Sequence, residues 1–251
     1  MSDGRRVILI TGCSSGIGLD AARTMAARGW RVFATCRREA DCARLRGEGF
    51  ESLRLDYEDE ASIDAAADAV LARAGGRLDA LFNNGAYAIP GFLEDVPTAA
   101  MRAIFEANFI GWHALTRRAL AAMRSQGHGR IVQCSSVLGF AAVRWRGAYC
   151  ATKHAVEGYT DALRLELRGS PIRVSLIEPG PIATRFNANA LSQYARWIDR
   201  DASPHRAELD AIEARYRKGD APNPFELPPS AVTRRLVHAV EAPRPRARYF
   251  V

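Results

Sequence analysis

A glycine-rich turn between a strand and a helix is the feature that most constrains the fold of this chain. The apolar stretch RVILIT (6–11) has the composition of a buried strand and runs directly into TGCSSGIG (11–18). The next stretch, GIGLDAARTMAARG (16–29), has the apolar spacing of a helix and closes on Gly29. A turn in this context presents the N–H groups of a helix N-terminus at the end of a strand, where an anion can bind.

The glycines of this turn predict which anion it binds. Gly12 can adopt the tight turn, whereas Gly16 and Gly18 let the backbone approach a pyrophosphate and let the helix pack closely on the strand. Glycine-rich turns also occur in ordinary loops between strands and helices. The strand before this turn and the helix after it favour binding of a dinucleotide.

Strand and helix patterns alternate along the rest of the chain. Further strand patterns occur at 31–36, 51–56, 78–84, 129–136, 172–180 and 247–251. Further helix patterns occur at 61–75, 98–127, 148–169 and 230–242. This alternation is typical of βαβ units. We therefore predict an α/β fold of the Rossmann type, a doubly wound parallel sheet in a single domain over residues 1–251.

The polar stretch 183–229 interrupts the alternation between the sixth strand and the next helix. Ligands of open α/β sheets bind at the carboxyl ends of the strands, so an insertion at that edge can cover them. We expect a helical substrate-loop insertion at about 183–229.

The end of the second strand predicts which dinucleotide binds. Folds of this kind hold the adenosine ribose of NAD with an acidic residue about 20 positions after the glycines, whereas an arginine there accommodates the 2′-phosphate of NADP. This chain has no acid in ATCRRE (34–39) before Glu39, and Arg37 and Arg38 occupy the turn. A guanidinium can pair with a phosphate, so the sequence favours NADP(H) over NAD(H), with Arg37 as the first candidate. The alternative is that both arginines are exposed loop charges.

Composition excludes several other classes of protein. The net charge is +7, but the arginines are spread along the chain without a basic patch, so we expect no nucleic-acid partner. The five cysteines are odd in number and lack C-x-x-C spacing, and the histidines lack metal-ligand spacing, so we expect no metal site. We find neither a signal-peptide core nor a transmembrane segment, and we expect a cytoplasmic protein.

A tyrosine and a rare lysine stand four residues apart in the helix pattern 148–169. The chain has two lysines, Lys153 and Lys218, and takes nearly all its positive charge from arginine. Tyr149 and Lys153 share one helix face. A cation near a tyrosine favours the phenolate and lowers its pKa, which is ordinarily near 10. An isolated pair of this kind is usually an exposed surface pair, but downstream of a nucleotide turn it is typical of an acid–base site.

Over almost its whole length the chain resembles the short-chain dehydrogenase/reductase family, in its short single-domain branch. The resemblance rests on several motifs in order and at family spacing. They are TGCSSGIG at 11–18, Asp56 after the third strand, NNGA at 83–86, NFIG at 108–111, SS at 135–136, YCATK at 149–153 and PGPIAT at 179–184.

The resemblance implies an NAD(P)-dependent oxidoreductase that transfers a hydride between the nicotinamide and a carbonyl or alcohol carbon. It implies that Tyr149 is the acid or base, that Lys153 also reaches the nicotinamide ribose, that Ser136 holds the substrate oxygen and that Asn108 anchors a water in a proton relay. It also implies that a further set of residues contacts the cofactor. These are Gly12, Ser14, Ser15, Gly16, Ile17, Gly18, Asp56, Asn83, Gly85, Ala86, Pro179, Gly180 and Thr184, with Tyr149 and Lys153 expected to contact the cofactor as well.

One motif departs from the family pattern. The family usually has Asn-Asn-Ala-Gly, whereas this chain has NNGA with Gly85 before Ala86. Alanine does not easily adopt a positive φ. Either the turn is rebuilt or the family glycine needs only small size.

The substrate and the assembly are less specified. Candidate pocket residues are mostly apolar or aromatic, namely Tyr87, Phe92, Leu138, Phe140, Val143, Trp145, Phe186, Tyr194 and Trp197. They favour an apolar ketone, aldehyde or secondary alcohol as the substrate. The motif sequences together resemble those of steroid- and retinol-dehydrogenase-like enzymes. The family implies a homodimer or homotetramer built on 98–127 and 148–169. A non-catalytic dinucleotide-binding sensor and an epimerase or dehydratase of the longer family branch are the alternatives.

Overall fold

A parallel sheet of seven strands forms the centre of this computed structural model, which describes residues 4–217 and 225–251. The strand order is β3-β2-β1-β4-β5-β6-β7, and every neighbouring pair is parallel. The strands are β1 (Val7–Ile10), β2 (Arg31–Cys36), β3 (Glu51–Arg54), β4 (Ala80–Asn83), β5 (Gly129–Cys134), β6 (Ile172–Glu178) and β7 (Arg248–Phe250). The prediction of a parallel α/β sheet of the Rossmann type is confirmed.

The order of the strands reverses at β1. Ile10, at the end of β1, pairs with Ala34 of β2 on one side and with Phe82 of β4 on the other. The loops that leave β1 and β4 therefore diverge at the carboxyl edge of the sheet, which is where open α/β sheets bind ligands.

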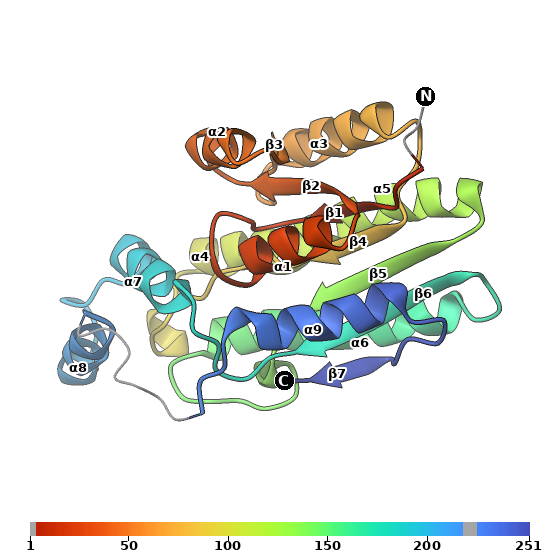
Figure 1. Cartoon of the computed structure of the whole chain (residues 1–251). Coiled ribbons are helices and arrows are strands. Elements are labelled where there is room, and N and C mark those ends of the chain that lie inside the picture. Colours follow the sequence, from red (N-terminus) through yellow and green to blue (C-terminus); the bar gives the residue numbers. More distant parts are fainter. Residues whose placement is uncertain (1–3, 218–224) are drawn as a thin grey trace.

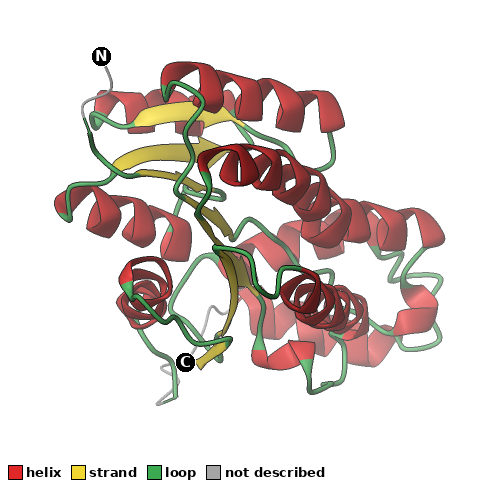
Figure 2. Ribbon diagram, turned by 90° about the vertical axis from the view of Figure 1, so that its right-hand side faces the viewer, coloured by secondary structure: helices red, strands yellow, loops and turns green. Residues whose placement is uncertain are grey.

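Helices cover both faces of the sheet, as Figures 1 and 2 show. On one face α1 packs against α9, and on the other α3 packs against α5 while α6 packs against β6. The helices are α1 (Gly16–Ala27), α2 (Glu39–Gly47), α3 (Glu60–Arg73), α4 (Thr98–Phe105), α5 (Gly111–Gln126), α6 (Gly147–Glu166), α7 (Phe186–Trp197), α8 (Arg206–Arg217) and α9 (Pro229–Glu241). All four residues of β1 are buried because helices exclude water from both sides of the strand.

The long helix pattern 98–127 is not one continuous α-helix. A π-helical turn, η2 (Glu106–Ile110), separates α4 from α5 and contains the buried residue Asn108. Such turns are frequent at functional sites. Apolar periodicity cannot reveal a single turn of wider hydrogen bonding. Helix α2 also lacks a sequence signal, because Cys42 and Leu45 are the residues that it buries.

The insertion contains α7 and α8, and Figure 1 shows both beyond the arrowheads of the strands. A parallel bridge between Ile182 and Leu227 brings its two ends together. On the outside, Ser203 Oγ donates 2.9 Å to Asp95 and His205 Nε2 lies 2.6 Å from Glu94. The insertion therefore rests on the loop after β4. Residues 218–224, including Lys218, lie outside the described residues.

Candidate active site

The glycine turn is tightly packed. A Cβ atom on Gly18 would lie 2.3 Å from the carbonyl oxygen of Gly12, and one on Gly12 would lie 2.7 Å from the Cα atom of Gly85. Gly12 and Gly16 also have positive φ, at 69° and 57°. Glycine is therefore required at these positions by close approach and by backbone conformation.

The N-terminus of α1 has the properties of a phosphate site. Ser15 is the N-cap residue but makes no side-chain capping hydrogen bond, and the first turn contains no acidic residue. The exposed N–H groups and the helix dipole favour an anion there. Arg44 adds a positive charge, because its Nη2 atom donates 2.8 Å to the carbonyl of Ser14. These residues fit the pyrophosphate of a dinucleotide.

Thr11 joins the loops that leave β1 and β4. Its Oγ1 atom accepts hydrogen bonds of 2.9 Å from the N–H of Asn84 and 3.2 Å from that of Gly85. Neither Gly85 nor Ala86 has a positive φ. A Cβ atom on Gly85 would meet Tyr57 and Gly12 at 3.3–3.5 Å. The exchanged glycine and alanine are thus tolerated because this turn needs small size and no left-handed backbone.

Asn83, which the resemblance includes among the cofactor contacts, has its side chain directed into the protein. Its side chain is fully buried and binds three protein groups, since Nδ2 donates to Thr116 and Gln133 and Oδ1 accepts 2.6 Å from Tyr57. The side chain therefore fixes the end of β4 from inside. Asp56 lies at the edge of this region, where its Oδ1 atom accepts 3.2 Å from the N–H of Glu58.

The two arginines after β2 have different surroundings. Arg38 Nε donates 2.9 Å to Asp41, whereas Arg37 is exposed and makes no ion pair within the described residues. Burial raises the pKa of Glu58, and the charges of Arg196 and Arg37 oppose that rise. Arg37 thus remains available to a ligand beside the second strand.

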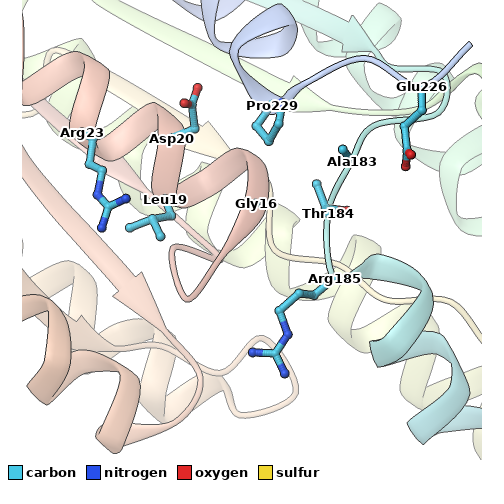
Figure 3. A pocket seen from close by; sticks show the side chains of 9 residues that line it. All are labelled: Gly16, Leu19, Asp20, Arg23, Ala183, Thr184, Arg185, Glu226 and Pro229. Atoms are coloured by element: carbon cyan, nitrogen blue, oxygen red, sulfur yellow. The ribbon is translucent and has the colours of Figure 1, made fainter. Parts of the chain in front are cut away.

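A cleft of about 530 Å³ opens between α1, the start of the insertion and α9 (Figure 3). Thr184 forms its wall against the glycine turn, where a Cβ on Gly16 would lie 2.9 Å from the Thr184 methyl group. Arg23 from α1 and Arg185 from the insertion also line it. The carboxylates of Asp20 and Glu226 line it as well, so the cleft combines the helix N-terminus with charges of both signs.

Tyr149 lies at the start of α6 and is 7% exposed. Burial, followed by the nearby Cys134, raises the pKa of its phenol, whereas a hydrogen bond with Ser136 and the charge of Arg146 lower it. The net effect is a rise, so the phenol is neutral at physiological pH. Burial is the largest of these effects. The Lys153 ammonium lies 5.6 Å from the ring centroid of Tyr149, where its charge favours the phenolate, so the expectation that Lys153 lowers this pKa stays a prediction.

Lys153 is a buried cation, 1% exposed. Its Nζ atom donates 2.7 Å to the carbonyl of Cys134 and lies 4.4 Å from the ring centroid of Trp112 and 5.6 Å from that of Tyr149. Burial lowers the pKa of the ammonium to about 8. The lysine is thus fixed between the end of β5 and the face of α6 that carries Tyr149.

Ser136 stands where β5 ends. Its Oγ atom accepts 3.1 Å from the N–H of Leu138 and donates 3.5 Å to the carbonyl of Pro179. Pro179 O also accepts 3.0 Å from Val137, while Gly180 N donates 2.9 Å to Val251. The loops after β5 and β6 are therefore joined beside Tyr149.

Asn108 lies in the π-helical turn and links this turn to the loop after β4 and to α6. Its Oδ1 atom accepts 3.0 Å from Tyr87 N, and its Nδ2 atom donates 2.8 Å to Tyr87 O and 3.2 Å to Thr152 Oγ1. Thr152 Oγ1 in turn donates 2.8 Å to the carbonyl of Tyr149. Asn108 therefore holds α6 and the loop after β4 in fixed register.

An apolar cluster surrounds Tyr149 under the insertion. The Tyr149 and Phe186 ring centroids are 5.3 Å apart. The structure brings seven of the nine predicted pocket residues into this cluster: Tyr87, Phe92, Leu138, Trp145, Phe186, Tyr194 and Trp197. It does not bring Phe140 and Val143 there, because they are 55% and 49% exposed and Phe140 packs against Phe250.

Sequence reasoning missed Thr11 and Arg146. The hydroxyl of Thr11 becomes visible as a junction only when β1 and β4 are neighbours. The position of Arg146, three residues before Tyr149, was a usable signal, since residues i and i+3 share a helix face. Within residues 4–217 and 225–251 no group of three or more His, Cys, Asp or Glu residues is placed to hold a metal ion, and none of the helices there combines the length and the hydropathy of a membrane span.

Known proteins similar to this chain are oxidoreductases by name. It is 42% identical over 247 residues to the uncharacterized oxidoreductase YbbO of Escherichia coli, covering 98% of this chain and 86% of the relative. It is 36% identical to retinol dehydrogenase 8 of Bos taurus, over 77% of this chain and 64% of that protein. It is 33% identical to human 17-beta-hydroxysteroid dehydrogenase type 1, over 98% and 77%.

Solved structures are similar in fold. A short chain dehydrogenase/reductase from Burkholderia phymatum in complex with NAD has a TM-score of 0.83 and 27% identity, covering 100% of this chain and 90% of that one. An actinorhodin polyketide ketoreductase with NADPH has a TM-score of 0.79 and 30% identity, covering 98% and 95%. A sequence model of the short chain dehydrogenase family matches residues 6–195, so the chain belongs to the short-chain dehydrogenase/reductase family and is an NAD(P)-dependent oxidoreductase.

Proposed function

We propose that this protein is an NADP(H)-dependent oxidoreductase that interconverts the carbonyl and alcohol forms of an apolar substrate. The observation that carries the proposal is the convergence of Tyr149, Ser136 and Lys153 at the carboxyl end of β5, next to the glycine turn. Membership of the family indicates the class of reaction, and the site indicates which residues would carry it out.

The residues that would hold the cofactor come from four loops. Gly12, Ser14, Ser15, Gly16, Ile17 and Gly18 would hold the pyrophosphate, and Asp56 with the backbone of Asn83, Gly85 and Ala86 would contact the adenosine side. Pro179, Gly180 and Thr184 would flank the nicotinamide. When bound, the cofactor supplies or accepts the hydride.

The chain's own residues would manage the proton and the oxygen. Tyr149 is neutral and can donate its proton to the substrate oxygen as negative charge develops there during carbonyl reduction. Ser136 would donate a hydrogen bond to the same substrate oxygen. Lys153, with a pKa of about 8, is mostly an ammonium at neutral pH and stabilises negative charge on Tyr149 after proton transfer. Asn108 keeps Tyr149 in register and anchors the proton relay.

The preference for NADP(H) rests on Arg37. Arg37 directly follows β2 and makes no ion pair with a carboxylate of the described residues. The turn that contains it has no acidic residue before Glu39. A guanidinium in this position can pair with a 2′-phosphate, whereas the usual carboxylate of NAD sites would repel it.

The apolar cluster around Tyr149 supports an apolar substrate, such as a ketone, an aldehyde or a secondary alcohol. Its aromatic rings offer large contact areas but few polar groups. The similarity to proteins named retinol dehydrogenase and hydroxysteroid dehydrogenase agrees with such a substrate. A non-catalytic sensor is not favoured, because a sensor has no need for the buried set of Tyr149, Lys153 and Ser136.

Two further properties belong to the proposal. We infer a homodimer or homotetramer that uses α4–α5 and α6, where Ile110 and Leu165 are exposed at 43% and 66%. We also infer a cytoplasmic location, since the five cysteines are free thiols. Light scattering of the purified protein measures the first property directly, and a monomer at micromolar concentration contradicts it.

The test is reduction of a panel of apolar ketones and aldehydes, followed by loss of NADPH absorbance. Tyr149→Phe should lower kcat/KM by about a hundredfold or more while binding NADPH normally. Tyr159→Phe is the matched control, because Tyr159 lies on the same helix and bonds to His113 outside the site. Activity retained by Tyr149→Phe, or an inactive wild type across the panel, would contradict the proposal.

A further inference from the structure

Arg146 places a cation one helical turn before Tyr149. It is the N-cap residue of α6, and its carbonyl accepts 2.8 Å from the N–H of Cys150, so the helix fixes its backbone. Residues i and i+3 lie about 5–6 Å apart on one helix face. This spacing brings Arg146 near Tyr149, and the charge of Arg146 lowers the pKa of the Tyr149 phenol.

The guanidinium lies among aromatic rings of the insertion. Its Cζ atom is 5.9 Å from the ring centroid of Phe186 and 5.3 Å from that of Tyr216. The Phe186 ring also packs against Tyr149 at 5.3 Å, so one aromatic side chain contacts both the cation and the tyrosine. Arg146 is thus part of the apolar cluster under the insertion rather than a surface charge.

Arg146 makes no ion pair with a carboxylate of the described residues. Its Nη2 atom donates 3.1 Å to Asn187 Oδ1, which uses one of five N–H donors, and none of the ion pairs among the described residues includes it. By contrast, Arg248 pairs with three carboxylates, those of Glu157, Asp161 and Glu178. Charges that lose water on burial are usually paired with an opposite charge, so a half-buried guanidinium without an ion pair is a candidate site for an anionic ligand.

A second donor on the same loop is unsatisfied. The indole N–H of Trp145 is buried without a hydrogen-bond partner among the described residues, and Trp145 has a positive φ of 67°. This backbone conformation is rare for a bulky residue and clusters at functional sites. Among the described residues the loop therefore presents a guanidinium without an ion-pair partner and an N–H without a hydrogen-bond partner, both immediately before Tyr149.

We propose that Arg146 binds an anionic group of the substrate. The substrate is then an amphipathic ketone or alcohol whose apolar part packs on Phe92 and Phe186 and whose oxyanion, a carboxylate or a sulfonate, lies within a few bonds of the reacting carbon. A guanidinium binds either oxyanion with two parallel hydrogen bonds. This inference rests on the proposed function and narrows its substrate class from apolar to amphipathic.

The test compares a long-chain γ-keto carboxylate with its methyl ester and with the sulfonate of the same chain. Wild type should reduce the carboxylate or the sulfonate with a kcat/KM at least about tenfold above that of the ester. The probe with the higher kcat/KM shows whether the site prefers a carboxylate or a sulfonate. Equal values for the acids and the ester would overturn the inference but leave the oxidoreductase proposal intact.

Variants assign the preference to one residue. Arg146→Gln should remove the preference for the acid, mainly through KM, and Arg146→Lys should retain part of it. Arg144→Gln is the matched control, because Arg144 stands on the same loop and also stacks on aromatic rings, those of Phe92 and Trp145, but is exposed. A preference that survives Arg146→Gln, or that Arg144→Gln removes equally, would contradict the assignment.

A binding measurement separates this inference from the proposed activity. Decanoate should raise the melting temperature of the wild type in the presence of NADP⁺, whereas decanol should raise it less, and Arg146→Gln should remove the difference. If the enzyme reduced none of the three carbonyl compounds but kept this difference, the reaction proposal would fail for these substrates and the anion site would stand. The absence of any difference between decanoate and decanol would overturn the anion site.

Discussion

Lys153 donates a hydrogen bond of 2.7 Å from its ammonium to the backbone carbonyl of Cys134, the last residue of β5. This bond joins the helix that carries Tyr149 to the strand that leads to Ser136. The ammonium is almost fully buried and also lies over the ring of Trp112. A compact cation fits here, whereas a planar guanidinium is larger and directs its donors differently.

Lys153→Arg should therefore keep the charge and lose activity. We expect kcat/KM to fall by about a hundredfold or more, because the guanidinium cannot reach both Cys134 O and the cofactor ribose from this buried position. Steady-state kinetics with a ketone substrate measure the loss, and circular dichroism checks that the variant is folded. Near-normal turnover would show that any cation suffices.

The buried ammonium should also make stability depend on pH. The pKa of Lys153 is lowered to about 8, below the value of about 10.4 for an unfolded chain, so the folded state holds this proton more weakly. The protonated lysine therefore destabilises the fold at neutral pH, and this cost disappears as pH rises from about 8 toward 10.4.

Comparison with Lys153→Met isolates this effect, because other titrating groups are shared. The stability of wild type relative to the variant should rise by up to about 3 kcal/mol between neutral pH and pH 10.4. Urea unfolding at several pH values measures the difference. A difference that does not change with pH would mean that the buried lysine holds its proton at its ordinary pKa.

The glycine turn should tolerate no side chain at Gly18. Alanine there places a methyl group 2.3 Å from the Gly12 carbonyl, so we expect a loss of about 1–3 kcal/mol in stability and weaker cofactor binding. Gly158→Ala is the control, since Gly158 is exposed in α6 with open space around it and should gain about 0.5–1 kcal/mol. Thermal unfolding and NADP⁺ titration test both, and an unaffected Gly18→Ala protein would disprove the close approach.

Arg37 should determine the choice of cofactor. Arg37→Ala should weaken NADP⁺ binding about ten- to hundredfold and leave NAD⁺ binding nearly unchanged, because only NADP⁺ carries the 2′-phosphate. Arg38→Ala is the control, as Arg38 already pairs with Asp41. Dissociation constants from fluorescence titration decide it, and equal affinity of the wild type for both dinucleotides would refute the preference.

The sequence by itself determined the sheet, the glycine turn and the pair of Tyr149 and Lys153, because each depends on local spacing. Apolar runs such as VILI set the central strands, close backbone packing demands the glycines, and positions i and i+4 share a helix face. The exchanged Gly85 and Ala86 left two readings open. The structure shows that the turn requires small side chains at these two positions and no left-handed backbone, since neither residue has a positive φ.

Tertiary structure alone decided which groups meet across the sheet. Asn83 turned inward because Tyr57, Thr116 and Gln133, distant in the chain, surround it. Phe140 and Val143 stayed at the surface although their composition suits a pocket. The raised pKa of Tyr149 follows from burial, and the contacts of Arg146 with Phe186 and Tyr216 follow from the packing of the insertion. Desolvation depends on every neighbour in space, and a linear pattern contains no record of those neighbours.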